Sequence, residues 1–192
     1  NLAIKLEESK KFYIERINFF GNYITEENVI RNSLLVDEGD AYNEILINKS
    51  VNEIKSRRLF KKVEKSVDNG SSSEFKIINI TVEEQPTGEI FAGAGTGTSG
   101  ATITAGIQEK NYLGKGIKLT TNLMISEDEI KGKFSVINPN FRGSDNGLST
   151  NIQSLTNDRM TDYGYKTTKT GVSLGTRFEY YDDFYVGPSF TA

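Results

Sequence analysis

The sequence contains no cysteine, no histidine and no tryptophan, and only three prolines among its 192 residues. Without cysteine the chain forms no disulfide and offers no thiolate ligand to a metal. Without histidine it lacks the side chain that most often serves as general base or metal ligand. The remaining residue types provide no recognisable pair of nucleophile and base. We therefore expect a protein with no metal, no cofactor and no enzyme activity.

Long hydrophobic runs and an excess of one charge are missing as well. No apolar stretch approaches the ~20 residues that a membrane-spanning helix needs. The net charge is −3, with 13 Lys and Arg against 15 Asp and Glu up to Pro86, and 10 against 11 after it. Neither half resembles a basic surface for nucleic acid or an acidic tail. We expect no nucleic-acid partner.

One phosphate-binding pattern is present but weak. Residues 95–100 read GxGxxG, yet a dinucleotide site needs a helix directly after the glycines, so that the helix N-terminus meets the phosphates. Residues 101–107 instead alternate apolar and polar side chains, which predicts a strand. A glycine-rich hairpin explains the pattern better than nucleotide binding.

The composition changes abruptly at Gln85-Pro86. Only three of the 18 glycines precede this point, and 15 follow it. Before it, helical and strand patterns are mixed; after it, one alternating run follows another. We predict an α+β domain followed by an antiparallel β array.

The first half shows a strand, two helices and a hairpin in that order. Residues 13–19 alternate as an extended segment, and a short helix follows with Thr25 as its expected N-cap. A second helix spans about residues 43–58, with Ile47, Val51 and Ile54 on one face. Residues 63–67 and 75–83 then form a hairpin. The order β-α-α-β-β predicts one small two-layer domain.

The second half has a period of two almost throughout. Alternating runs occupy residues 101–107, 117–125, 130–136 and 172–178. Turn signals between the runs indicate six strands and the start of a seventh. A β-sandwich with one wet face is one interpretation. A transmembrane barrel is the other, and it is favoured by runs of about 9–11 residues and by polar Lys, Asn, Thr and Ser at alternate positions.

Two segments are candidate binding sites because of their backbones. The first hairpin strand is expected to lie at a sheet edge, where it could pair with an extended partner or merely be protected by its charges. Its residues are Val63, Glu64, Lys65, Ser66 and Val67. The first strand after the boundary has small side chains that pack weakly and specify register weakly, as expected of a seam, although crowding by neighbours would also require small residues. Its residues are Ile90, Phe91, Ala92, Gly93, Ala94, Gly95 and Thr96.

Several segments resemble a known family. Residues 12–22, 29–31, 38–43 and 59–63 resemble a POTRA domain. Residues 84–89, followed by Gly93-Ala94-Gly95, resemble the junction into the barrel of the BamA family of outer-membrane β-barrel assembly proteins. Residues 111–116 and 138–141 resemble the first two periplasmic turns of that barrel. The similarity covers about residues 11–192.

The resemblance implies a fold, a location and partners. Residues 1–86, with a core at about 11–85, would be a POTRA domain in the periplasm, and residues 87–192 the first six or seven strands of a sixteen-stranded outer-membrane barrel. The protein would fold and insert nascent outer-membrane proteins without ATP, by pairing Ile90 to Thr96 with a client strand. Assembly lipoproteins, outer-membrane lipid and periplasmic chaperones would be further partners.

Three residues depart from the family pattern, and two other functions stay open. Thr96 stands where relatives often have an aromatic residue. Asn32-Ser33 replaces a frequent Arg-Glu pair, so a lipoprotein salt bridge there is not expected. We interpret the chain as part of a longer protein. The alternatives are a secretion pore of the same superfamily, of the two-partner type, and a soluble periplasmic protein-binding module.

Overall fold

The structure is a computed structural model that describes residues 11–97, 100–181 and 184–192. Residues 1–10 of the predicted first domain lie outside the described residues, as do Thr98 and Ser99 of the GxGxxG pattern. The chain divides into two compact units. The first comprises residues 1–23 and 33–85, and the second comprises residues 24–32 and 86–192.

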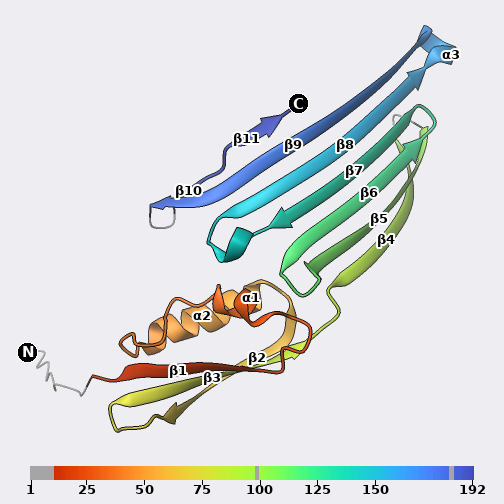
Figure 1. Cartoon of the computed structure of the whole chain (residues 1–192). Coiled ribbons are helices and arrows are strands. Elements are labelled where there is room, and N and C mark those ends of the chain that lie inside the picture. Colours follow the sequence, from red (N-terminus) through yellow and green to blue (C-terminus); the bar gives the residue numbers. More distant parts are fainter. Residues whose placement is uncertain (1–10, 98–99, 182–183) are drawn as a thin grey trace, which may run out of the picture. The chain divides into compact units, whose positions relative to one another are not determined.

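The first unit is a three-stranded sheet with a helix across one face (Figure 1). Its elements are β1 (Tyr13–Phe20), α2 (Glu44–Ser56), β2 (Phe60–Asn69) and β3 (Phe75–Glu84). The strand order is β1-β3-β2, with β1 parallel to β3 and β2 antiparallel to it. Together with the short helix α1 between β1 and α2, this is the predicted β-α-α-β-β order.

Helix α2 begins with a side-chain cap and contributes its apolar stripe to the core. The Asn43 carboxamide oxygen accepts hydrogen bonds from the backbone N–H groups of Ile45 and Leu46, at 2.9 and 3.3 Å, which satisfies two otherwise unpaired donors of the first turn. The predicted stripe is confirmed, because all three of its residues are buried. They are Ile47, Val51 and Ile54.

The short helix α1 (Glu27–Arg31) does not begin as predicted. Its N-cap is Glu26, without a side-chain cap, and the expected N-cap Thr25 lies one residue earlier. The Thr25 hydroxyl instead accepts a hydrogen bond from the side chain of Asn111. The prediction was wrong because this partner lies 86 residues away in the sequence, where local capping rules give no indication of it.

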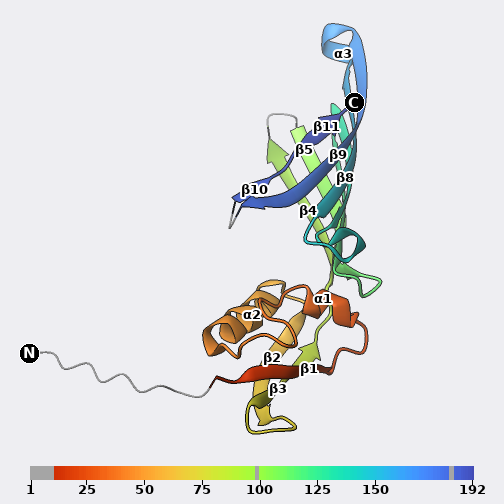
Figure 2. The same ribbon diagram turned by 60° about the vertical axis from the view of Figure 1, so that its left-hand side comes forward.

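The second unit is an open antiparallel sheet. Its strands lie side by side in chain order, with β4 at one edge and β10 and β11 at the other (Figure 1). Seen from a direction turned by 60°, the sheet is curved (Figure 2). The strands are β4 (Gly88–Gly97), β5 (Gly100–Tyr112), β6 (Ile117–Ser126), β7 (Glu129–Asn138), β8 (Gly147–Arg159), β9 (Tyr165–Tyr181), β10 (Phe184–Val186) and β11 (Ser189–Thr191).

The last two short strands behave as one interrupted strand. Val186 pairs with Phe178 and Ser189 with Gly175, so β10 and β11 run along β9 in continuous register. Gly187 and Pro188 separate them, and proline has no N–H to donate to a ladder. Among the described residues, the sheet therefore has six long strands and a broken seventh. The predicted fold class, an α+β domain followed by an incomplete antiparallel sheet, is confirmed.

The register places apolar side chains together on one face of the sheet. Directly paired residues share a face: Ile103 pairs with Ile125, and Phe134 with Ile152, which in turn pairs with Val172. These side chains are exposed in the isolated chain. The opposite face carries the row Gly106, Asn122, Lys133 and Gln153.

The apolar face ends on β8 and β9 in paired hydroxyl groups. Ser154 and Thr170 lie 3.2 Å apart, and Thr156 and Thr168 lie 3.1 Å apart. Beyond them Lys166 forms an ion pair with Asp158 at 2.6 Å. The two strands then meet through α3 (Met160–Tyr163). The apolar face therefore stops short of the β8–β9 tip.

Within the described ranges, no helix is long and apolar enough to cross a bilayer. The same residues contain no group of three or more carboxylates arranged to hold a metal ion.

The core of the first unit provides a matched test. Ile54 is fully buried, whereas Ile45 on the same helix is 69% exposed. We expect Ile54→Ala to lower the free energy of unfolding of this unit by about 2–5 kcal/mol, because it leaves a cavity. Hydrogen exchange of the β3 amides measures this loss. Ile45→Ala should change the value by less than about 0.5 kcal/mol, and equal effects of the two variants would contradict the assignment of the core.

Candidate functional site

The structure places the predicted seam strand at an open edge of the large sheet. All seven predicted residues, from Ile90 to Thr96, lie in β4. Among the strands that the structure describes, β4 pairs with β5 alone. Every residue of β4 is exposed. An edge strand of this kind presents unpaired backbone N–H and C=O groups along its outer side.

The alternation of bonded and non-bonded residues along β4 shows which residues have unpaired N–H and C=O groups. The N–H of Lys110 donates to the C=O of Thr87 at 3.3 Å, and the two residues are directly opposite by the register of β4 and β5. In an antiparallel pair, bonded and non-bonded residues alternate. Odd-numbered residues of β4 therefore bond to β5. Four of the seven predicted residues therefore direct N–H and C=O outward: Ile90, Ala92, Ala94 and Thr96.

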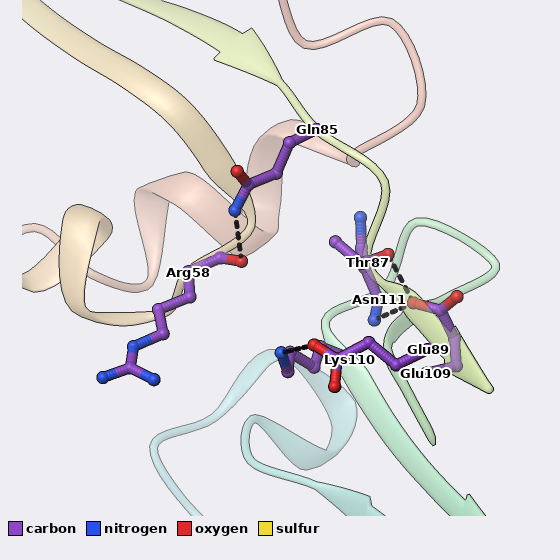
Figure 3. A network of polar contacts seen from close by, with 7 residues as sticks. All are labelled: Arg58, Gln85, Thr87, Glu89, Glu109, Lys110 and Asn111. Atoms are coloured by element: carbon purple, nitrogen blue, oxygen red, sulfur yellow. Dashed lines mark hydrogen bonds and ion pairs between the residues drawn. The ribbon is translucent and has the colours of Figure 1, made fainter. Parts of the chain in front are cut away.

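Polar side-chain contacts hold the start of β4, whereas few side chains pack against its second half. Lys110 forms an ion pair with Glu89 at 2.6 Å, and the Thr87 hydroxyl donates to the Glu109 carboxylate (Figure 3). Beyond Ala92, the glycines at 93, 95 and 97 have open space where a side chain would be. This half of β4 is held by backbone hydrogen bonds with little side-chain packing.

The residue before the boundary is fixed within the first unit. The side-chain amide of Gln85 donates to the backbone carbonyl of Arg58 at 3.0 Å (Figure 3). Arg58 has a φ of 57°, a left-handed conformation that is uncommon for a residue with a side chain. Gln85 therefore satisfies a carbonyl at the irregular turn between α2 and β2.

The turn between β5 and β6 is organised by Asn111, a role that the sequence did not reveal. Its side chain accepts from the N–H of Gly116 at 2.8 Å and donates to the Thr25 hydroxyl at 2.9 Å. Its own N–H donates to Glu109 at 2.7 Å. All of these residues belong to the second unit. The sequence indicated a turn at 111–116, but not the contact with residue 25.

A backbone contact accompanies this side-chain contact. The N–H of Glu26 donates to the carbonyl of Gly114 at 2.8 Å. Gly114 has a φ of +72°, and a Cβ at this position would overlap the Ile24 carbonyl. Glycine is therefore required here for two reasons, its conformation and the close approach of another backbone.

The second predicted site, β2, also lies at an edge. The order β1-β3-β2 leaves one side of β2 without a neighbouring strand among the described residues. The N–H of Gly70 donates to Phe75, so by the same alternation Val63, Lys65 and Val67 direct their backbone groups outward, while those of Glu64 and Ser66 bond to β3.

Charged side chains lie along the open edge of β2. Lys62 and Glu64 form an exposed ion pair at 2.8 Å, and the hydrogen bond that the Lys62 ammonium donates to the Glu64 carboxylate raises the pKa of Lys62 above its ordinary value. Lys65 reaches Glu44 of α2 at 3.4 Å. Such charges oppose pairing with another strand. A binding role for residues 63–67 stays a prediction.

The fold defines the class of protein as a POTRA domain followed by a barrel-type antiparallel sheet. The POTRA family, described as "Surface antigen variable number repeat", matches residues 12–85. BamA from Haemophilus ducreyi, in a crystal structure lacking POTRA domains 1–3, superposes with a TM-score of 0.80 at 25% identity, over 96% of this chain and 36% of that one.

Curated sequences agree with this similarity. Outer membrane protein assembly factor BamA of Buchnera aphidicola subsp. Acyrthosiphon pisum is 26% identical over 177 residues, which are 86% of this chain and 28% of that protein. The Neisseria meningitidis serogroup B protein of the same name is 22% identical over 180 residues, or 91% and 23%. The chain is therefore similar to BamA-type outer membrane protein assembly factors, with a POTRA match over residues 12–85, and it spans about a quarter of the length of these two.

A wider likeness concerns the fold alone. CdiB from Acinetobacter baumannii superposes with a TM-score of 0.56 at 11% identity, over 87% of this chain and 33% of that one.

The hydrogen bonds of the Asn111 side chain lead to a prediction about the turn between β5 and β6. Asn111 is 8% exposed, so Asn111→Ala should leave the Gly116 N–H without its acceptor and weaken the turn by about 1–3 kcal/mol. Faster hydrogen exchange of the Gly116 amide measures this change. Asn146→Ala, which alters an exposed asparagine in another turn, is the control. Unchanged exchange at Gly116 in Asn111→Ala would contradict the assigned role.

Proposed function

We propose that this chain is the part of an outer-membrane protein assembly factor that accepts a client β-strand at β4. The observation that carries the proposal is the open edge itself, where four of the seven predicted residues direct backbone N–H and C=O groups outward. An extended client strand would continue the antiparallel ladder there, as in β-augmentation. No covalent bond changes in this mechanism, and it uses no nucleotide. The binding energy of the ladder drives it.

The two faces of the sheet support an outer-membrane location. Apolar side chains share one face, and Lys, Asn and Gln share the other, which is the alternation of a barrel wall between lipid and a wet lumen. The hydroxyl pairs Ser154–Thr170 and Thr156–Thr168 would mark the end of the lipid-facing band on β8 and β9. The POTRA domain would then lie in the periplasm.

Nascent outer-membrane proteins are the proposed clients, because the curated relatives are named as assembly factors for outer membrane protein. Their strands present the same alternation of apolar and polar side chains as β5 to β9. A client strand added to β4 would therefore extend both faces of the sheet without a mismatch. Assembly lipoproteins and periplasmic chaperones stay predictions.

Strand addition predicts a pattern of crosslinks with a period of two. Residues 91, 93 and 95 would form the non-hydrogen-bonded pairs with an added strand, in which Cα atoms approach to about 4.5 Å. We expect single cysteines at these positions, in the full-length protein, to form disulfides with single cysteines in a urea-unfolded outer-membrane client during its assembly in vesicles. Positions 90, 92 and 94 should react more slowly.

The control uses the same face of an interior strand. Cysteines at 131, 133 and 135 lie on β7, which β6 and β8 flank on both sides. Little capture is expected there, because no edge is available. Capture at β7 equal to that at β4, or no capture at β4, would refute strand addition.

A further inference from the structure

Phe91 makes an unusually close contact across the β4–β5 pair. It lies directly opposite Gly106. A Cβ atom at position 106 would lie 2.8 Å from Phe91 Cε1 and would also overlap the ring's Cζ and the Thr121 carbonyl oxygen. The phenyl ring therefore covers the bare backbone of Gly106, which is buried. An aromatic ring over a cross-strand glycine is a recognised way of pinning strand register.

Phe91 lies on the polar face of the sheet, and its contact with Gly106 explains how an apolar ring is packed there. The row that contains Gly106 continues through Asn122, Lys133 and Gln153. Lipid would not cover an apolar ring on this face. Phe91 is only 40% exposed, whereas Ile90 on the opposite face is 84% exposed. The glycine, and not a membrane, provides the packing partner of Phe91.

The rest of β4 does little to oppose a slip along β5. A slip by one residue would exchange the two faces, but a slip by two preserves them. Because Gly97 pairs with Gly100, a two-residue slip in either direction lengthens the connection between β4 and β5 from two residues to four. The slip that keeps Glu89 beside Lys110 is the one that moves β4 away from this connection. That slip would bring Gly93 opposite Gly106 and Glu89 opposite Lys110, so the existing ion pair would survive. It would, however, remove Phe91 from Gly106.

We infer that Phe91 is a positioning residue that fixes the register of β4, and with it the register in which the edge is offered to a client strand. The inference rests on the proposed function for its second part. A two-residue slip moves the outward N–H and C=O groups by about 7 Å along the strand. A client added to a slipped β4 would be displaced by the same distance relative to the rest of the sheet.

Two engineered disulfide pairs, in the full-length protein with any other cysteine replaced by serine, report the register. Ala92→Cys with Ala105→Cys joins residues that are paired in the structure, and Ala94→Cys with Ala105→Cys joins residues that would be paired after the slip. We expect the first pair to oxidise much faster in the otherwise unaltered protein. Phe91→Ala should reduce this preference by up to roughly fivefold, which corresponds to the upper end of the range for a cross-strand pair.

Matched variants separate register from general destabilisation. Phe91→Tyr keeps the ring and should restore the preference. Ile90→Ala removes a large side chain from the adjacent residue on the other face, and it should leave the preference unchanged. Phe91→Leu replaces Phe91→Ala if the alanine variant does not assemble, and it should give an intermediate preference.

The outcomes distinguish the two proposals. An unchanged preference in both Phe91→Ala and Phe91→Leu, or an equal loss in Ile90→Ala, overturns the inference even where β4 still captures clients. A changed preference together with a client strand displaced by two residues relative to β5 supports it in full. A changed preference without any client capture at β4 supports the intrachain register role and overturns both the client part and the proposed function.

Discussion

The structure depends on one constraint, that every backbone N–H and C=O needs a partner. From β5 to β8 each strand has a neighbour on both sides, and the ladder provides these partners. On β4 the constraint is met on one side only, and alternate residues leave their groups directed outward. A bilayer offers no water to satisfy such groups. In the proposed membrane setting, the unpaired side of β4 therefore favours pairing with whatever extended strand is available.

The small side chains of β4 have two opposite effects. Gly93 and Gly95 leave open space on the polar face, so the backbone there is accessible and little side-chain packing resists a new neighbour. The same lack of side chains leaves register poorly specified. A single aromatic ring placed over Gly106 compensates for this at the first half of the strand. Accessibility and register are thus provided by different residues of one strand.

Much of the architecture could be predicted from sequence, because its signals are local. The period of two identified the strands, and the stripe of Ile47, Val51 and Ile54 identified α2. Residues whose role depends on a distant partner could not be assigned. Threonine is a common N-cap residue, but Thr25 contacts Asn111. The contact between Phe91 and Gly106 can be recognised only when the register of β4 and β5 is known. Alternation cannot reveal that register, since a shift by two residues leaves the pattern the same.

The pairing of Gly97 with Gly100 has a consequence for how strands can be exchanged. It joins β4 to β5 through a two-residue connection at one end, while contacts of Thr87, Glu89 and Phe91 hold the other end. A strand tethered at both ends cannot be displaced by branch migration, in which an invading strand replaces the resident strand residue by residue from a free end. In the proposed function, an incoming strand at this edge would therefore be added to the sheet, and β4 would remain in place for the next client.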